Sequence, residues 1–298
     1  MSNKFTIDIC PVCQGSSFQK YLDVPDWLVS KQSFEIKECT SCTFRFTANA
    51  PSQEEIGPFY DSEEYVEHSD TQKGLIYSLY HYARKYMLNY KYRKIQKLST
   101  GKKLLDIGSG SGYFAGFMQT KGYDVSGVEI SEKAKKLCEE KFGIAAKSPE
   151  QFLNGELGGG YNLISLWHVL EHVYTLDEYF KLFTQSLAEN GHLVIALPNS
   201  NSTDAKMYQE YWAAFDVPRH LWHFTPSTFE KLANNKGFDV IKKHRLPLDV
   251  FFISMVSASY KKSFTFLPVT LVKACVGYLS SLLNPNNASS LIYVLKKR

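Results

Sequence analysis

The chain has 298 residues, of which 44% are hydrophobic and 21% charged, with a formal net charge of +4 at pH 7. This is enough for one or two packed domains, and the small charge neither demands nor excludes a nucleic-acid partner. The sequence shows no tandem repeat, no low-complexity tract and no apolar signal-peptide core at its beginning.

Two CxxC pairs characterise the first segment, namely Cys10 with Cys13 and Cys39 with Cys42. Two such turns can supply four thiolates to one tetrahedral Zn²⁺, and a closed site of four cysteines is structural rather than catalytic. A redox-active pair is the alternative, but two pairs within a short polar segment favour zinc. Because this pattern suits a reducing compartment, we expect a zinc-ribbon-like module over residues 1–58 and a cytoplasmic protein.

Residues 72–98 contain no proline and predict one long helix that is rich in tyrosine, lysine and arginine. Such aromatics and cations could stack bases and bind phosphates. Periodic aromatic residues more often pack against a protein core. We therefore expect residues 59–100 to form a helical connector that covers the neighbouring site as a lid.

The most informative pattern is an apolar strand at residues 103–107 that leads into a glycine loop and a helix. The loop contains three glycines, Gly108, Gly110 and Gly112. A second strand follows and ends at Glu129. If the two strands are parallel neighbours, Asp106 and Glu129 flank one crevice at their carboxyl ends.

The spacing of the glycines and the position of the acid indicate what this crevice binds. A dinucleotide fold spaces its glycines G-x-G-x-x-G, whereas here the third glycine comes one residue early. Asp106 would repel a pyrophosphate but attract an ammonium. S-adenosylmethionine has an ammonium, a carboxylate that suits a helix N-terminus, and a ribose diol that Glu129 can bind. A strand–turn–helix without a ligand is the alternative, and the two acids argue against it.

The motif LLDIGSGSG, followed by GVEIS, resembles the first two motifs of the class I S-adenosylmethionine-dependent methyltransferases. The resemblance covers about residues 101–245 and the last strand. It implies an α/β fold with a Rossmann-like sheet that is mostly parallel and has an antiparallel last strand. It also implies that Asp106 and the three glycines line the methionine end of the cofactor and that Glu129 binds the ribose. We add Ser109 of the glycine loop, and Trp167 and His168 at the end of a later strand on the same crevice, to the expected cofactor site.

The remaining core continues the alternation of strands and helices within a methyltransferase domain at residues 101–298. The predicted strands are at 144–146, 161–167, 191–197, 238–245 and 291–297. Insertions fall at about 200–226 and 246–289. Glu150 is the nearest acid to the position where members of this family bind adenine, but it lies in a helix-capping box, so adenine recognition stays open.

The segment LWHVLEHV resembles the fourth motif of the quinone and small-molecule O-methyltransferase branch. It places His168, Glu171 and His172 just after a strand end. Methyl transfer mainly needs alignment and a dry site, and an oxygen or acidic-carbon nucleophile also needs a base. We assign His172 as the first candidate base, with Glu171 to orient a histidine and His168 as the second. A satisfied histidine at a helix start is the alternative.

The insertion at about 200–226 is polar and aromatic. Arg219 could pair with a carboxylate or phosphate of the substrate, and His220 or His223 could contact substrate, with His220 a further candidate base. In the alternative reading, Asp216 and Arg219 form an ion pair that only stabilises the loop. We place substrate binding first, because polar loops above such sheets often determine specificity.

Residues 264–283 read FTFLPVTLVKACVGYLSSLL and approach the length of a membrane span. Pro268 and Lys273 argue against spanning. Our order of expectation is packing in the core or in a homodimer, then peripheral contact with a membrane surface, then a transmembrane helix.

Together these patterns predict a methyltransferase that uses S-adenosyl-L-methionine, holds a structural Zn²⁺ and methylates an oxygen or carbon of a small metabolite, sugar or lipid-like acceptor. The zinc module resembles that of sugar C-methyltransferases, and also that of a ribosomal RNA guanine methyltransferase. An RNA methyltransferase and a non-catalytic cofactor-binding protein are the alternatives. The chain lacks both an NPPY-type signature and paired catalytic cysteines in its core, which lowers the nucleic-acid assignment without excluding it.

Overall fold

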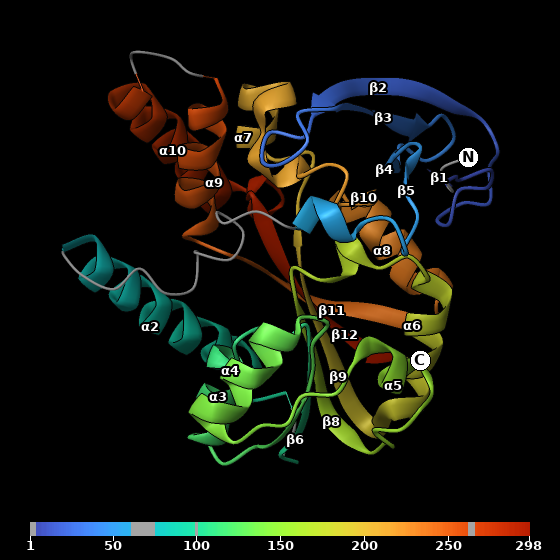
Figure 1. The fold of residues 1–298 in the computed structure, drawn as a ribbon, viewed down its shortest axis with the longest axis vertical. Helices are drawn as coiled ribbons and strands as arrows, with labels where there is room; N and C mark the ends of the chain where they lie inside the picture. Colours follow the sequence, from blue (N-terminus) through green and yellow to red (C-terminus); the bar gives the residue numbers. More distant parts are fainter. Residues whose placement is uncertain (1–3, 61–74, 99–100, 262–265) are drawn as a thin grey trace.

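The computed structural model describes residues 4–60, 75–98, 101–261 and 266–298 (Figure 1). Parts of the expected connector, residues 61–74 and 99–100, lie outside the described residues. The same holds for residues 264–265 of the apolar stretch.

A mixed six-stranded sheet forms the centre of the molecule, in the order β11-β12-β9-β8-β6-β7. Its strands are β6 (Lys103–Ile107), β7 (Asp124–Val128), β8 (Tyr161–Trp167), β9 (Leu187–Pro198), β11 (Phe238–Arg245) and β12 (Ser290–Lys297). Strands β7, β6, β8 and β9 are parallel neighbours. Strand β12 is antiparallel to both β9 and β11. This confirms the predicted fold class, with its antiparallel last strand.

Helices cover both faces of the sheet, because its strands are apolar on both sides. These helices are α2 (Leu75–Ile95), α3 (Tyr113–Gln119), α4 (Glu132–Phe142), α5 (Pro149–Leu153), α6 (Leu176–Ser186) and α8 (Pro226–Asn235). On β6, Leu105 and Ile107 join a core with residues of α6 and α8. Leu104 instead faces the opposite side and joins a core with residues of α2 and α3. The alternation of the strand thus fixes both layers.

One predicted strand is wrong. Around residues 144–146 the structure has only an isolated bridge between Val128 and Lys147. Gly143, at φ 68°, ends α4, and the capping box at Ser148 begins α5. The segment between these two caps is too short to form a strand that pairs along its length.

The first segment forms a second, four-stranded antiparallel sheet in the order β10-β4-β3-β2. Its strands are β2 (Phe18–Pro25), β3 (Ser33–Cys39), β4 (Arg45–Thr47) and β10 (Trp222–His223), and β1 (Lys4–Phe5) pairs with β5 (Ala50–Pro51). Strand β10 comes from the predicted insertion at 200–226. Its Trp222 stacks on Phe44 of the module, with ring centroids 5.8 Å apart. The cysteine module and the insertion therefore share one sheet and one core.

The remaining helices are α7 (Thr203–Tyr208), α9 (Asp249–Tyr260) and α10 (Phe266–Leu283). Short 3-10 helices occur at Gly57–Tyr60, Leu170–His172, Gln209–Tyr211, Ala213–Phe215 and Pro285–Asn287. Helices α9 and α10 lie between β11 and β12 in sequence, as the predicted second insertion requires. Within the described ranges, no helix has both the length and the apolarity needed to cross a membrane.

Candidate functional site

The carboxyl end of β6 lies at a switch point of the sheet, with β7 on one side and β8 on the other. Chain connections leave this point in opposite directions, which opens a crevice in sheets of this type. Asp106 lies near the end of β6, Glu129 directly follows β7, and Trp167 ends β8. The structure therefore brings these predicted cofactor residues to one edge of the sheet (Figure 1).

The three loop glycines all adopt positive φ, at 69° for Gly108, 53° for Gly110 and 82° for Gly112. A Cβ at Gly108 would lie 2.2 Å from the Cγ2 of Val169, and one at Gly112 would lie 2.4 Å from the Sγ of Cys138. Both positions therefore require glycine for packing as well as for conformation. At Gly110 an added Cβ would meet no atom of the described residues within 4 Å, which leaves space beside its backbone for a ligand.

Asp106 is only 1% exposed and accepts a hydrogen bond of 2.6 Å from the Ser165 hydroxyl. Burial raises its pKa to about 7, although Ser165 and Lys91 oppose this rise. A bound ammonium would supply the positive charge that favours the carboxylate. Glu129 accepts hydrogen bonds from the backbone N–H groups of Gly110 and Ser131, at 2.8 and 2.9 Å. Each of its oxygens keeps acceptor capacity for a ribose diol.

Two further groups at this edge suit a polar ligand. The Trp167 indole N–H is buried and has no hydrogen-bond partner among the residues that the structure describes, which is rare for a buried donor. The Lys91 ammonium from α2 lies 4.1 Å from the centroid of the Trp167 ring. Burial lowers the pKa of Lys91 to about 8, against the opposing charges of Asp249 and Asp106. Sequence reasoning placed Lys91 in a lid helix but did not assign it to the site.

His168 links two carboxylates and has an unusual backbone, with φ at 59°. Its Nδ1 lies 3.5 Å from Glu171 and its Nε2 lies 3.2 Å from Asp249, the first residue of α9. Burial disfavours the charged ring, but the two carboxylates raise its pKa to about 9. The ring is therefore cationic at neutral pH and cannot accept a proton, so the geometry favours an electrostatic role over the predicted role as a base.

His172 has the opposite protonation state. Its Nδ1 lies 3.1 Å from the Arg219 carbonyl oxygen and 3.0 Å from the Tyr60 hydroxyl. Burial, assisted by His220, lowers the pKa of His172 to about 4. A carbonyl can only accept, so the neutral ring that makes this bond has its proton on Nδ1 and its lone pair on Nε2. Tyr60 precedes the ring by 112 positions, and nothing local in the sequence indicates the contact.

Glu171, His172 and His220 form a compact group whose ligand atoms lie within 4.8 Å of one another. The two histidine rings pack edge to face, with centroids 4.5 Å apart. Glu171 is fully buried, and the neighbouring histidines keep its pKa low despite burial. Two imidazoles and one carboxylate could also ligate a divalent cation, so the group suits either proton transfer or metal binding.

The other predicted substrate residues have structural partners. The Arg219 guanidinium is buried and donates to Asp216, to Asp26 and to the Phe59 carbonyl. Arg219 therefore forms the stabilising ion pair with Asp216 that was the alternative to substrate binding, and a second ion pair with Asp26 of the cysteine module.

The two histidines of this insertion are also bonded. His220 pairs through Nδ1 with the Ala214 carbonyl at 2.9 Å. His223 is buried, bonds the Thr47 hydroxyl at 2.9 Å, and has its pKa lowered by burial. The geometry therefore favours structural roles for Arg219 and His223 and leaves His220 beside His172.

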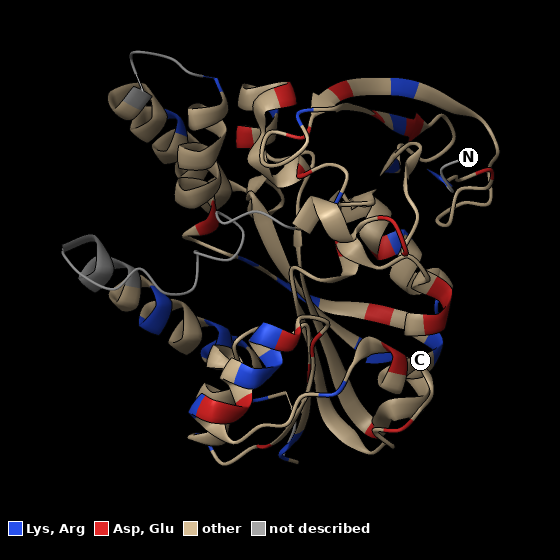
Figure 2. Cartoon of the chain, in the orientation of Figure 1, with Lys and Arg blue, Asp and Glu red and all other residues tan. Residues whose placement is uncertain are grey.

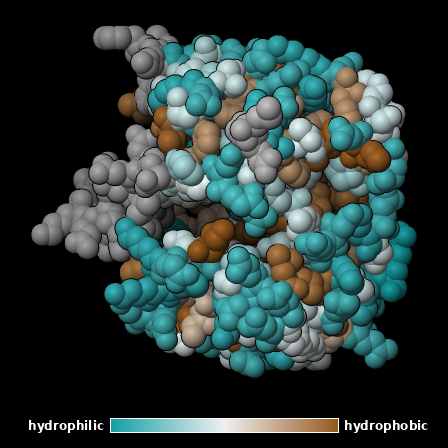
Figure 3. All heavy atoms as spheres, turned by 45° about the vertical axis from the view of Figure 1, so that its right-hand side comes forward, coloured by the Kyte–Doolittle hydropathy of each residue, from teal (hydrophilic) through white to brown (hydrophobic). Residues whose placement is uncertain are grey.

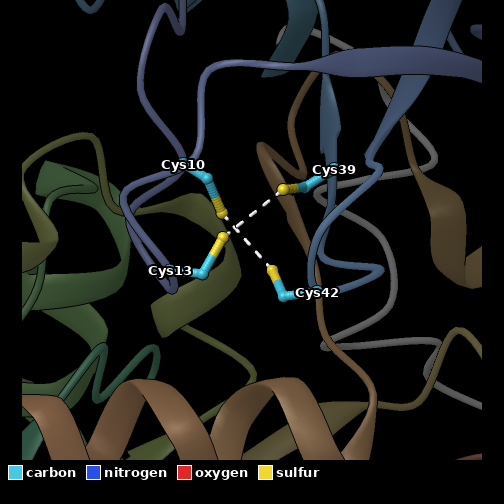
Figure 4. A group of neighbouring side chains, drawn as sticks. All are labelled: Cys10, Cys13, Cys39 and Cys42. Atoms are coloured by element: carbon cyan, nitrogen blue, oxygen red, sulfur yellow. Dashed lines mark hydrogen bonds between the residues drawn. The ribbon is translucent and has the colours of Figure 1, made fainter.

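The four predicted metal ligands converge in the first segment (Figure 4). The Sγ atoms of Cys10 and Cys42 lie 3.6 Å apart, and those of Cys13 and Cys39 lie 3.5 Å apart. Thiolates about 2.3 Å from a tetrahedral zinc would lie about 3.8 Å from one another, so the cluster matches such a site with little adjustment. Both close contacts join one CxxC pair to the other, which suits a shared metal better than two separate redox pairs.

Comparison with known proteins gives a consistent result. Residues 79–243, more than half of the chain, match the family described as "Methyltransferase domain". The ubiquinone biosynthesis O-methyltransferase of Psychrobacter arcticus is 30% identical over 169 residues, which cover 50% of this chain and 64% of that protein. The enzyme of the same description from Cupriavidus pinatubonensis is 26% identical over 155 residues, covering 48% and 62%. The matches thus span less than two thirds of these relatives.

Solved structures support the fold. A SAM-dependent methyltransferase from Archaeoglobus fulgidus superposes with a TM-score of 0.50 at 20% identity, covering 72% of this chain and 94% of that one. The magnesium protoporphyrin IX methyltransferase of Synechocystis, solved with bound SAH, gives a TM-score of 0.51 at 13% identity, covering 80% and 97%. At these identities the similarity establishes the architecture of the sheet and its helices.

Proposed function

The chain belongs to the family of methyltransferase domains, and we propose that it transfers the methyl group of S-adenosylmethionine to a hydroxyl oxygen of a small, largely apolar acceptor. The observation that supports this most directly is the position of a neutral histidine, His172, just past the end of β8, the strand that also supplies Trp167 to the cofactor edge. The names of the curated relatives favour oxygen as the methylated atom.

The cofactor residues divide by chemistry. Asp106 would bind the ammonium, Glu129 the ribose diol, and the backbone at Gly110 would approach the ligand closely. Lys91 of α2 lies near Asp106 and suits the carboxylate of the same ligand. When bound, S-adenosylmethionine supplies a methyl group on a sulfonium, which needs no further activation.

The acceptor hydroxyl would lose its proton to Nε2 of His172 as its oxygen forms a bond to the methyl carbon. The methyl–sulfur bond would break with its electron pair on sulfur, which leaves S-adenosylhomocysteine as the other product. The Arg219 carbonyl and the Tyr60 hydroxyl hold the ring through Nδ1, which fixes the tautomer that this step requires. Buried Glu171 favours the imidazolium that forms, because it places a negative charge beside the ring. Proton transfer of this kind typically contributes about 10²–10⁴ in rate.

We also propose that the four-cysteine cluster binds Zn²⁺ as a structural element. The thiols are crowded and partly buried, and the metal would compensate their negative charge. The cluster stabilises the sheet that supplies Asp26 to Arg219, and through the Arg219 carbonyl it supports His172.

The test is methyl transfer from labelled donor to a panel of phenols and catechols with and without alkyl chains, and to a cell extract. His172→Gln should lower kcat about 100-fold or more, while affinity for S-adenosylhomocysteine stays within about twofold. His192→Gln, on β9, is the matched control and should keep full activity. Binding of the cofactor product without methylation of any component would refute the enzymatic function, and label found only in RNA would refute the small-molecule acceptor.

A further inference from the structure

Helix α10 buries its small and polar residues and exposes its large apolar residues, the reverse of a normal amphipathic helix. Its buried residues are small or polar, namely Thr270, Ala274 and Ser281, and Gly277 packs against Val250 of α9. Its large apolar residues face outward: Leu267, Leu271, Val272, Leu279, Leu282 and Leu283 are 51–90% exposed. In water, a helix on a protein surface turns its large apolar side chains toward the core.

The neighbouring helix extends this outward apolar face. Phe252 and Met255 of α9 are each 54% exposed, and α9 and α10 pack side by side (Figure 1). Monomeric proteins rarely expose a continuous apolar patch of this kind without a function. The face drawn in Figure 3, in contrast, is mostly hydrophilic, with apolar side chains in smaller groups. The expectation that α10 packs in the core is thus correct only for its small residues.

Apart from Asp249, the two helices that form the apolar face contain no acidic residue. The sequence contains no Asp or Glu at residues 250–298 or at 71–105, and Figure 2 shows acidic colour on α9 only at its beginning. Lys206 and Lys261 are exposed near this face, and the ammonium of Lys273 lies 4.5 Å from the ring centroid of Tyr208.

Helix α2 adjoins α10 through Arg245. The Tyr90 hydroxyl donates to the Arg245 carbonyl at 2.8 Å, and the Arg245 guanidinium donates to the hydroxyl of Ser281 at 3.1 Å. Beside Tyr90, α2 has a groove of about 270 Å³, whose lining residues are Tyr82, Lys85, Tyr86, Asn89, Tyr90 and Arg93. Exposed tyrosines and cations are typical of the headgroup level of a membrane.

We propose that the outward face of α9 and α10, with the basic groove of α2, docks on an anionic membrane surface. The large residues of α10 would enter the boundary of the acyl chains, and the lysines and arginines would contact the headgroups. A second copy of the chain is a poorer occupant, because a two-fold contact would bring the exposed lysines beside this face, Lys206 and Lys261, close to those of the other copy. This inference does not rest on the identity of the methyl acceptor.

The test is flotation of the full-length protein with phosphatidylcholine vesicles that contain or lack phosphatidylglycerol. The protein should float with the anionic vesicles, less at high salt, and the variant Leu271→Gln/Leu279→Gln should bind about tenfold more weakly or worse. Ile241→Gln on β11, where Ile241 is 44% exposed, is the matched control and should bind like wild type.

Folding and oligomeric state are measured on the same samples. The double variant should keep its thermal unfolding temperature, because the altered side chains are exposed. Failure of wild type to float with anionic vesicles, or equal flotation of the double variant, would overturn the proposal. A dimer in sedimentation velocity that the double variant converts to a monomer would also overturn it and identify the face as a subunit interface.

Discussion

Replacing Asp106 by Asn should weaken cofactor binding and at the same time stabilise the empty protein. Asp106 is 1% exposed, and the bond from Ser165 to its Oδ1 occupies only part of its acceptor capacity. A hydrogen bond between a carboxylate and an ammonium contributes about 1.5–3 kcal/mol. Asn keeps an oxygen for Ser165 but loses the charge, so the dissociation constant for S-adenosylhomocysteine should rise about tenfold to hundredfold.

The stabilisation follows from the raised pKa of Asp106. In the unfolded chain the carboxyl ionises near the ordinary aspartate value of 3.8, whereas in the folded protein its pKa is about 7. Between these values the folded state binds more protons, so its stability falls as the pH rises through this range, by at most about 4 kcal/mol. Asn removes this cost, and the unfolding temperature at pH 8 should rise.

Calorimetric titration with S-adenosylhomocysteine and thermal unfolding measure the two effects on the same samples. The wild-type affinity should also fall as the pH drops below about 7, where Asp106 binds a proton, and the Asn variant should lose this dependence. Unchanged affinity in the variant would refute the role of Asp106. A lower unfolding temperature at pH 8 would refute the argument from burial.

Three further predictions concern the surroundings of the site. Asp249→Asn should lower the pKa of His168 from about 9, because it removes one of two carboxylates at the ring; an unchanged imidazole titration by NMR would contradict this. In the wild type the same pairing stabilises the fold below pH 6.5, the ordinary pKa of histidine, and its contribution is lost as the pH rises through 9. Gly112→Ala should reduce the free energy of unfolding in denaturant by about 2–4 kcal/mol. The alanine would have to adopt the φ of 82° found at Gly112, and its Cβ would lie 2.4 Å from the Cys138 sulfur. A loss of stability below about 1 kcal/mol would be too small for this clash. Chelation of metal, or Cys13→Ser, should release zinc and lower the unfolding temperature, whereas a metal-free protein of equal stability would exclude the structural role.

The fold was predictable wherever local patterns decide it. Strand β11 begins and ends at the predicted residues, Phe238 and Arg245, because apolar residues and a preceding glycine define it. The strand expected at 144–146 was not formed, since two helix caps compete for the same short segment. The pairing of β10 with β4 depends on residues about 175 positions apart, which no local pattern reports.

In the candidate site, too, the features that depend on a local motif were predictable and those that depend on distant residues were not. Backbone-determined features, such as the positive φ of Gly108, follow from the motif itself. The protonation states of His168 and His172 do not, because Asp249 and Tyr60 reach them from distant segments. The outward face of α10 was also hidden, since a strongly apolar sequence looks the same whether its large residues face the core or the surroundings.

A crystal structure with S-adenosylhomocysteine would show directly whether Asp106 and Glu129 bind the cofactor. We expect density at the carboxyl ends of β6 and β7, with the ammonium within hydrogen-bond distance of Asp106 and the ribose hydroxyls on Glu129. Density elsewhere, or a ligand in the crevice that contacts neither carboxylate, would contradict it.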